Sequence, residues 1–414
     1  MTGLAPRLAE VVAPLIGDLP VRLRAWDGSE AGPEGAPVVE LRSPAALRRL
    51  LWHPGELGAA QAYVTGEAEI PGDLGAALDA LLAAGRAAGN GVRPRAEALA
   101  RAARLARLPG LLGTPPEPPA TQARVRGRLH TRARDRRSIS HHYDLSNAFY
   151  GAILDESMAY SCGYFTDPGN DLEQAQRDKV ALICAKLGLQ RGDTLLDVGC
   201  GWGSLTLYAA QYVGARVVGV TISEEQRRFV QERIDVLGLG DRAEVRLCDY
   251  RDAEGGYDAV ASVEMGEHVG ERMYPTYARV LRERVRPGGR VLIQQMSRTG
   301  RHPGGGPFIE SFIAPDMHMR PVGETVAHLE RAGLEVRDVH ALREHYVLTV
   351  DAWIVRFEER RDELTALVGE EMVRVWRLYL AGGAAAFRDG RMGVDQILSV
   401  RPGGAHGLPL ERGW

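Results

Sequence analysis

The residues best suited to chemistry begin with a glycine-rich segment, DVGCGWGS, at 197–204. Gly199, Gly201 and Gly203 permit a tight turn and let a ligand approach the backbone, while the start of the following helix presents free N–H groups. The pattern alone also fits a nicotinamide-cofactor fingerprint or a sharp strand-to-helix turn without a ligand. By itself it therefore leaves a bound cofactor and a purely structural turn open.

Three details of the surrounding sequence argue against a nicotinamide cofactor. The glycines are spaced G-x-G-x-G and not G-x-G-x-x-G, so the turn is shaped for something other than a pyrophosphate. The next strand ends in GVTIS (219–223) and lacks the acid that usually binds the ribose of NAD. CDYRD (248–252), after the third strand, then offers a position for contact with an adenine.

A second chemical group lies in SVEMGEHVG (262–270). Glu267 and His268 follow a predicted strand, at the carboxyl edge of the sheet where open α/β folds bind their ligands. The same acid also suits the start of the next helix, where the helix dipole is positive. The sequence therefore leaves a catalytic and a structural role open for this pair.

Alternating elements must position these residues. Strand and helix patterns alternate from about residue 190, and near-continuous apolar strands separated by helices imply a parallel sheet covered on both faces. Residues 345–390 are predicted to be largely helical. The predicted strands are 193–199, 216–222, 243–250, 257–265, 290–296 and 396–402.

The first 90 residues predict a small α+β unit. Alternating strand patterns at 21–26 and 38–42 flank a turn region rich in Gly, Pro and Asp, and helical patterns follow at 44–52 and 73–85. The charged groups of this unit are scattered. It is therefore expected to serve interaction and not catalysis.

Charge concentrates in one segment of an otherwise balanced chain. The 414 residues carry 51 basic and 54 acidic side chains, which argues against nucleic acid as the main partner. Residues 93–137 hold twelve arginines and three acids, a local charge of +9. That segment is either a solvated linker or a patch for anionic lipid headgroups, where each basic residue contributes about 1 kcal/mol. The predicted division is 1–90, a basic linker at 91–137 and a larger α/β domain at 138–414.

Cysteine spacing and hydropathy bear on the compartment. The four cysteines are widely spaced, with no cluster at zinc spacing, so no metal is expected and a reducing cytoplasm fits best. No basic leader precedes a long apolar run, and no stretch reaches the ~18 apolar residues that a spanning helix needs. We expect a cytoplasmic protein that is soluble or associates peripherally with the inner face of the membrane.

DVGCGWG resembles motif I of class I S-adenosylmethionine methyltransferases, and the chain is similar to the cyclopropane-fatty-acyl-phospholipid synthase family over about residues 138–402. Residues 41–67 resemble the extra N-terminal domain of its phospholipid-acting members. The resemblance implies a Rossmann-like α/β fold with a mostly parallel seven-stranded sheet, a smaller α+β domain for lipid interaction, and helical insertions that bind acyl chains. The matching motifs are HHYDLSNAFY (141–150), YSCGYF (160–165), LLDVGCGWGS (195–204), VVGVTIS (217–223), CDYRD (248–252), SVEMGEHVG (262–270) and YLAGGAAAFR (379–388).

The resemblance implies S-adenosylmethionine as the cofactor and nine residues that hold it. Gln226 has a structural alternative, because S-x-x-Q at 223–226 fits a capping box in which Gln226 reaches back to the Ser223 amide. The methionine end is expected near Tyr160, Ser161, Gly199 and Gly201, and the adenosine end near Thr221, Ile222, Gln226, Asp249 and Tyr250.

The resemblance also implies a catalytic anion site. In the family, the glutamate that matches Glu267 lies beside a bound bicarbonate, and Cys162 and Tyr346 match residues around that anion. Gln294 stands where typical members have an anion-holding histidine, and Met296 replaces an isoleucine whose amide contributes, so the site is altered or absent. The catalytic residues expected from the resemblance are Glu267, His268, Cys162, Tyr346 and Gln294.

The implied reaction transfers a methyl cation from the sulfonium to a cis double bond in an acyl chain of a membrane phospholipid. It leaves a carbocation that water would trap, so the pocket must be dry, and one base must remove a proton from the added methyl group. Direct proton loss closes a cyclopropane, whereas a prior 1,2-hydride shift gives a methylene branch. The altered anion site slightly favours the methylene branch. Aromatic residues expected to line the pocket are Tyr164, Phe165, Trp202, Phe308, Phe312, Tyr346 and Trp353.

Other readings of the sequence stay open. The product could be a cyclopropane alone, the substrate could be a soluble small molecule, or the chain could be a non-catalytic lipid-binding protein that keeps a relic cofactor fold. The expected partners are the acyl chain of a phospholipid and an anionic membrane surface. A homodimer and a separate reductase that acts on the product are further partners that the sequence leaves open.

Overall fold

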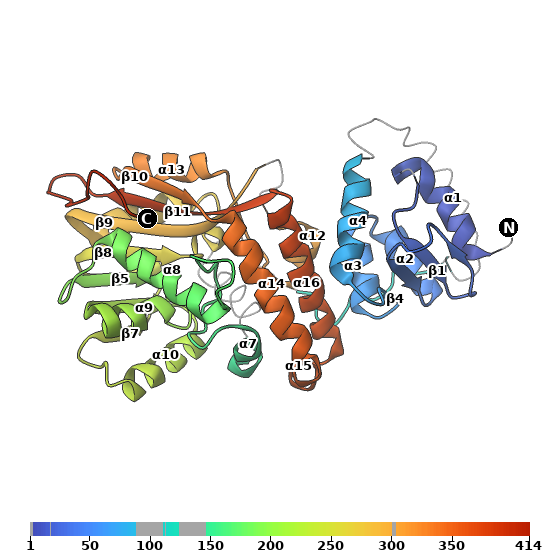
Figure 1. The fold of residues 1–414 in the computed structure, drawn as a ribbon, viewed down its shortest axis with the longest axis horizontal. Helices are drawn as coiled ribbons and strands as arrows, with labels where there is room; N and C mark the ends of the chain where they lie inside the picture. Colours follow the sequence, from blue (N-terminus) through green and yellow to red (C-terminus); the bar gives the residue numbers. More distant parts are fainter. Residues whose placement is uncertain (1–2, 17, 88–110, 112, 124–145, 300–303) are drawn as a thin grey trace. The chain divides into compact units, whose positions relative to one another are not determined.

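The computed structural model describes residues 3–16, 18–87, 111, 113–123, 146–299 and 304–414. These residues form two compact units, which are described separately (Figure 1). One unit takes its described residues from 1–124, 306–313 and 361–385, and the other from 125–305, 314–360 and 386–414. Each unit combines separate stretches of the chain, so the two units do not test the predicted division at residues 90 and 137. That division stays a prediction. All twelve arginines of the basic segment lie outside the described residues.

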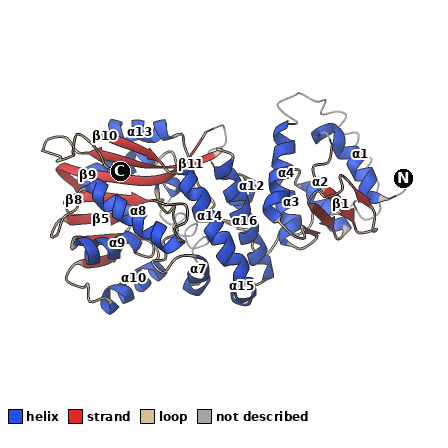
Figure 2. Cartoon of the chain, viewed as in Figure 1, coloured by secondary structure: helices blue, strands red, loops and turns tan. Residues whose placement is uncertain are grey.

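The larger unit is built on a seven-stranded sheet with the order β10-β11-β9-β8-β5-β6-β7 (Figure 2). Neighbouring strands from β9 to β7 pair in parallel, whereas β11 is antiparallel to both β9 and β10. The prediction of a mostly parallel α/β sheet is therefore confirmed. The strands are β5 (Thr194–Val198), β6 (Arg216–Thr221), β7 (Ala243–Leu247), β8 (Tyr257–Val263), β9 (Val285–Arg298), β10 (Glu335–Ala341) and β11 (Met392–Val400).

Helices cover both faces of this sheet. Side chains alternate between the two faces of a strand, so the neighbours Leu195 and Leu196 of β5 belong to two different apolar clusters. Both side chains are fully buried, as the continuous apolar pattern of a central parallel strand predicts. The helices of this unit are α7 (Asn147–Ile153), α8 (Leu172–Leu187), α9 (Ser204–Tyr208), α10 (Glu224–Val236), α11 (Tyr274–Arg284), α13 (Val322–Arg331) and α14 (Arg343–Glu359).

The strand order reverses beside β5, whose two neighbours are β6 and β8. Chain connections therefore leave β5 and β8 in opposite directions along the sheet, and the crevice at their carboxyl ends is where such folds bind ligands. The glycine-rich turn follows β5 directly, and the SVEMGEHVG segment follows β8. The fold thus places the two chemical groups found in the sequence at one edge.

The smaller unit contains a four-stranded sheet with the order β2-β1-β3-β4, in which β1 and β3 are parallel. No helix among the described residues of either unit is both long enough and apolar enough to cross a membrane. The strands are β1 (Arg22–Ala25), β2 (Glu30–Ala31), β3 (Val38–Leu41) and β4 (Ala68–Glu69). The helices are α1 (Leu4–Ile16), α2 (Pro44–Trp52), α3 (Glu56–Val64), α4 (Leu74–Ala87), α12 (Pro307–Phe312), α15 (Arg361–Val368) and most of α16 (Glu370–Arg388).

A buried arginine joins α16 to the N-terminal part of the smaller unit. The Arg374 guanidinium donates to the backbone oxygen of Tyr63 at 2.6 Å and to the carboxylate of Glu69 at 2.7 Å. It also lies 4.3 Å from the centre of the Tyr63 ring. Because a buried guanidinium needs all of these partners to offset its lost hydration, the helix and the small sheet are bound into one unit.

Candidate active site

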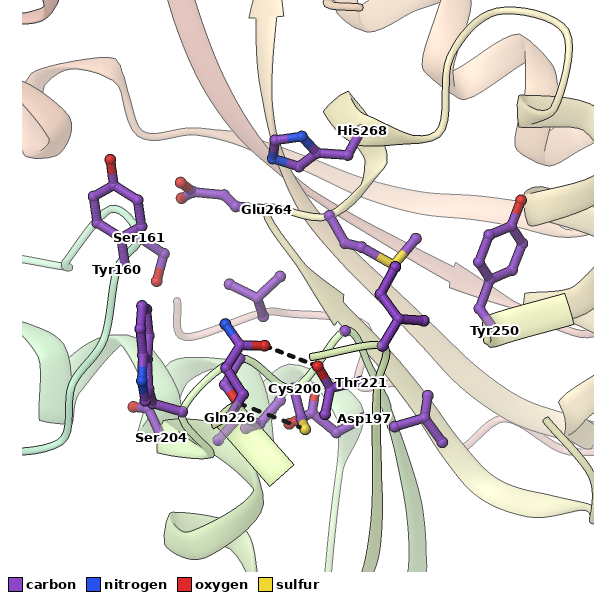
Figure 3. Close-up of a pocket in the computed structure, with 18 of the residues that line it drawn as sticks. Tyr160, Ser161, Asp197, Cys200, Ser204, Thr221, Gln226, Tyr250, Glu264 and His268 are labelled. Carbon is purple, nitrogen blue, oxygen red and sulfur yellow. Dashed lines mark hydrogen bonds between the residues drawn. The ribbon is translucent and has the colours of Figure 1, made fainter. Parts of the chain in front are cut away.

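A cavity of about 150 Å³ opens at the carboxyl edge of the larger sheet, beside β5, β6 and β8 (Figure 3). It is partly open to solvent, and more of its wall is apolar than polar. All nine residues expected to hold the cofactor line this cavity: Tyr160, Ser161, Gly199, Gly201, Thr221, Ile222, Gln226, Asp249 and Tyr250.

The glycine turn forms one wall of the cavity. Gly199 has φ 76° and Gly201 has φ 55°, in the left-handed region that side chains other than glycine rarely adopt. A Cβ at Gly199 would lie 2.7 Å from Cγ of Met265, so the backbone approaches its neighbour closely there. A Cβ at Gly201 would meet no atom within 4 Å. The space in front of Gly201 is therefore open to a ligand.

Gln226 at the start of α10 faces the cavity and is not part of a complete capping box. The Ser223 hydroxyl accepts from the backbone N–H of Gln226 at 3.3 Å, which is the expected N-cap bond. Oε1 of Gln226, however, accepts from the Thr221 hydroxyl at 2.8 Å, and the Ser223 amide donates to Oγ1 of Thr221. The side chain is thereby turned toward the cavity, with its Nε2 group left to bind a ligand (Figure 3).

Asp249 lines the cavity but pairs with its own turn. Its carboxylate accepts from the guanidinium of Arg251 at 2.6 Å and from the Arg251 amide at 3.0 Å. The same guanidinium lies 5.3 Å from the centre of the Tyr250 ring. Arg251 thus orients two of the five predicted adenosine contacts, Asp249 and Tyr250.

A buried lysine lines the cavity beside the predicted methionine end of the site. Nζ of Lys179 donates to Oγ of Ser161 at 2.9 Å, and only 2% of the lysine is exposed. Burial lowers the pKa of Lys179, although acidic groups including Asp155 and Glu264 oppose this effect. Sequence reasoning did not find this residue. The feature that could have drawn attention to it is the rarity of lysine, because Lys179 is one of only two lysines in the chain.

Glu264, which the sequence analysis did not select, projects into the polar side of the cavity. Its Oε1 accepts from the Cys162 amide at 2.8 Å and from Nε2 of Gln294 at 2.9 Å, and its Oε2 accepts from the Tyr346 hydroxyl at 2.7 Å. Figure 3 shows the carboxylate directed toward the segment that carries Ser161. Three residues predicted to surround an anion therefore do meet, and they meet around Glu264.

Supporting contacts hold this cluster in place. Gln294 accepts from Nε2 of Gln396 at 2.9 Å, which fixes its amide so that Nε2 faces Glu264. Burial raises the pKa of the Cys162 thiol well above its usual range, and the charge of Glu264 adds to that effect. Cys162 is therefore a neutral thiol, and its backbone amide is the group that serves the cluster.

Glu267 and His268 differ in how they relate to the cavity. Glu267 is 1% exposed and is not part of the cavity wall; its Oε1 accepts from the Met296 amide at 2.5 Å. Oε2 of Glu267 has no hydrogen-bond partner among the described residues, and burial raises the pKa of this carboxyl to about 8. His268 lines the cavity, and burial lowers its pKa to about 4. Near pH 7 both side chains are therefore neutral.

Aromatic rings surround the cluster. The Tyr346 and Trp353 rings lie 6.0 Å apart, Trp353 and Tyr160 lie 5.4 Å apart, and Trp202 is part of the cavity wall. Of the aromatic residues expected to line the pocket, Trp202 is in the cavity wall and Tyr346 binds Glu264 through its hydroxyl, while Phe308 and Phe312 belong to the smaller unit, where they pack on each other.

Comparison with known proteins agrees with this geometry. Residues 130–397 match the mycolic acid cyclopropane synthetase family. The chain belongs to this family. A probable fatty acid methyltransferase of Mycobacterium tuberculosis is 38% identical over 412 residues, which cover 96% of this chain and 95% of that protein. A tuberculostearic acid methyltransferase of the same organism is 36% identical and covers 93% of this chain and 88% of that protein.

A solved member of the cyclopropane synthetase family has the same fold. The mycolic acid cyclopropane synthase CmaA1, crystallised with SAH and CTAB, superimposes with a TM-score of 0.60 at 30% identity and covers 64% of this chain and 98% of that one. The chain is therefore an S-adenosylmethionine-dependent methyltransferase. The cavity fits that cofactor, since the open space in front of Gly201 and the inward-facing Gln226 amide lie where the motifs predict its two ends.

Proposed function

We propose that this methyltransferase acts on the cis double bond of an unsaturated fatty acyl chain while the chain is esterified in a membrane phospholipid. The observation that carries the proposal is the carboxylate of Glu264, held by three donors in a cavity that the glycine turn also lines. Attack on an alkene needs such a group, because the added carbon must later lose a proton. The names of the fatty acid methyltransferase relatives support an acyl substrate.

The bound cofactor would supply an electrophilic methyl group, and the protein must supply everything else. Trp202, Tyr160 and Trp353 offer aromatic faces that tolerate a carbocation and exclude water. Cys162, Gln294 and Tyr346 form the polar side of the pocket. Glu267, which is buried outside the cavity wall, is the residue proposed to support the base. The nine cavity residues predicted for S-adenosylmethionine bind and orient that cofactor.

We propose a methylene branch as the main product. The support comes from Gln294, which stands where a histidine is expected and here binds Glu264. The tuberculostearic acid methyltransferase adds support, since it is named for methyl transfer to a fatty acid and not for cyclopropane formation. A separate reductase would convert the methylene branch to a methyl branch. A cyclopropane as the sole product is the second candidate, favoured by the family match itself.

The decisive test is incubation of the enzyme with S-adenosylmethionine and oleoyl phospholipid vesicles, followed by mass spectrometry and proton NMR of the released acyl chains. Either product gains one CH₂ unit, so NMR must distinguish exocyclic methylene protons from cyclopropyl protons. We expect methylene protons. Cyclopropyl protons alone would establish the second candidate. Turnover of a soluble acceptor but not of vesicles would replace the lipid assignment, and failure to bind cofactor in calorimetry would favour a non-catalytic role.

We further propose that the enzyme binds the cytoplasmic face of the membrane through the arginines of residues 93–137. Each basic residue near an anionic surface contributes about 1 kcal/mol, and salt screens this attraction. Co-sedimentation should therefore show binding to vesicles that contain phosphatidylglycerol, loss of binding in high salt, and weak binding to phosphatidylcholine alone. Equal binding to both vesicle types would reject the electrostatic contact.

A further inference from the structure

The cluster around Glu264 has no place for the bicarbonate that the resemblance implies. A carboxylate presents the same planar pair of oxygens as bicarbonate, and Glu264 already accepts from the Cys162 amide, Nε2 of Gln294 and the Tyr346 hydroxyl. The second proton of that Nε2 faces the Cys162 oxygen at 3.3 Å. The Met296 amide, a fourth donor expected to serve the anion, is bonded to Glu267. The four donors expected to serve a second anion here are thus already engaged, and such an anion would meet the like charge of Glu264.

The backbone of Glu264 is held in an unusual conformation to place its carboxylate there. Its φ is 50°, in the left-handed region that costs a side-chain-bearing residue roughly 1–2 kcal/mol. Its amide donates to the backbone oxygen of Gln294 at 2.6 Å, so β9 holds the strained residue at the end of β8. Strain that the surrounding structure maintains is typical of functional positions.

We propose that the Glu264 carboxylate is the base of the reaction and replaces bicarbonate, so that turnover needs no added anion. This inference rests on the proposed function. After the methyl cation has bonded to the alkene, the acyl chain carries one positive charge. One C–H bond of the added methyl group then breaks, and its electron pair forms a new carbon–carbon bond. Direct loss of the proton forms the ring bond of a cyclopropane, whereas proton loss after a 1,2-hydride shift forms the double bond of a methylene branch. The released proton bonds to Glu264, and the neutral acid later returns it to solvent through the open side of the cavity.

The protonation states of Glu264 and Glu267 are consistent with this role. Burial raises the pKa of Glu264, but the Tyr346 hydroxyl, the Cys162 amide and the Gln294 amide all stabilise its ionised form, as does the charge of Lys179. Glu267 has one backbone donor, and its pKa is about 8. Glu264 is thus the carboxylate of the pair, and Glu267 is the neutral acid. Tyr346 and Gln294 are positioning residues for the base.

The first test is the anion requirement of the wild-type enzyme. Vesicle assays are run in buffer depleted of CO₂, with and without added sodium bicarbonate, at matched ionic strength. We expect the same rate within twofold in both conditions. A rate that falls at least tenfold on depletion and returns with bicarbonate would overturn the inference while leaving the proposed function intact. Absence of any acyl methylation by wild-type enzyme that binds cofactor would instead overturn the proposed function.

The second test uses variants of Glu264. Glu264→Gln keeps the size of the side chain and should lower turnover at least 100-fold, with affinity for S-adenosylhomocysteine within a few-fold in calorimetry. Glu264→Gly relieves the positive φ and vacates the three donors, so formate or bicarbonate should restore at least tenfold of the lost rate. Glu254→Gln, which alters an exposed acid, is the control and should behave as wild type.

Each outcome of the variant test decides the inference. Normal turnover by Glu264→Gln removes Glu264 as the base. A Glu264→Gly variant that binds cofactor normally and yet gains nothing from either small anion also contradicts the inference, because the vacated donors should then accept it. Rescue by formate and bicarbonate in this variant alone, with no effect on wild type, is the result that supports it.

Discussion

Two neighbouring glutamates, three residues apart, have different environments in this enzyme. Glu264 meets donors from three separate segments, while Glu267 meets a single backbone amide and has one oxygen without a partner in the described part of the chain. Hydrogen bonds to a carboxylate favour its charged form, whereas burial without them favours the neutral form. The hydrogen bonds of each carboxyl group therefore distinguish Glu264, the proposed base, from Glu267, the neutral acid.

The raised pKa of Glu267 predicts a stability effect with a defined sign. The folded chain keeps a proton on Glu267 up to a pKa of about 8, while the unfolded chain releases it near the ordinary value of 4.5. The free energy of unfolding therefore falls as pH rises between these values. Between pH 5 and pH 8, Glu267→Gln should gain on the order of 3 kcal/mol relative to wild type. Urea unfolding followed by circular dichroism at both pH values measures this change.

A matched variant makes that stability measurement specific. Glu232→Gln changes an exposed acid on α10, so its stability relative to wild type should not vary with pH. If the curves of Glu267→Gln and wild type stay parallel from pH 5 to pH 8, the carboxyl of Glu267 does not carry a raised pKa.

Tyr346 predicts an effect on rate without an effect on cofactor binding. Its hydroxyl donates to Oε2 of Glu264 at 2.7 Å, and a hydrogen bond to a charged group contributes about 1.5–3 kcal/mol. Tyr346→Phe should therefore lower kcat by about 10- to 100-fold and shift the acid limb of the pH profile upward. Steady-state kinetics on vesicles with parallel calorimetry of S-adenosylhomocysteine would test it. A raised Kd with unchanged kcat would place Tyr346 in cofactor binding instead.

The turn between β5 and α9 brings the backbone to the wall of the cavity. Its glycines adopt positive φ, and the turn borders open space only at Gly201 and close neighbours at Gly199 and Gly203. This difference separates glycines needed for packing from a glycine needed for ligand approach.

Gly201→Ala tests that distinction with a matched control. Gly238, at the end of α10, also has positive φ and no atom within 4 Å of a built Cβ. Both alanine variants should therefore lose a similar stability, about 1 kcal/mol. Only Gly201→Ala should weaken S-adenosylmethionine binding, at least tenfold in calorimetry. Equal affinity in both variants would mean that the ligand does not approach the turn at Gly201.

The chain returns to its N-terminal unit through α12, α15 and α16. Arg374 is the clearest link within that unit, since it is 5% exposed and binds Tyr63, Ala68 and Glu69. The smaller unit is therefore assembled from segments about 300 residues apart in the chain. Its stability depends on tertiary contacts and not on its first segment alone.

Arg374→Ala should destabilise the smaller unit by about 3–5 kcal/mol, because it removes the buried cation that pairs with Glu69 and leaves that carboxylate with the half-exposed Arg42 at 3.4 Å. Arg279→Ala, which breaks an exposed pair with Glu283, should cost less than about 1 kcal/mol. Thermal unfolding monitored by limited proteolysis compares the two. Similar losses in both variants would show that Arg374 does not hold the unit together.

Most of the sheet was predictable from local patterns. β5, β6 and β8 have buried apolar runs, and the structure contains each of them close to its predicted bounds. β10 (Glu335–Ala341) was missed, because this edge strand alternates charged and partly exposed residues in place of an apolar run. The strand order was not predictable from local patterns either, since β5 pairs with both β6 and β8, and β8 lies about 60 residues away along the chain.

Local patterns were enough to place the glycine turn and the segments after β6, β7 and β8 at one edge of the sheet, because motifs that follow parallel strands meet at its carboxyl edge. The folded chain alone shows that Cys162, Gln294 and Tyr346 surround Glu264 and not Glu267. Those residues come from a loop, a strand and a helix that are remote in the chain. Their meeting point depends on strand pairing, on helix packing and on one positive φ, and local sequence patterns report none of these three.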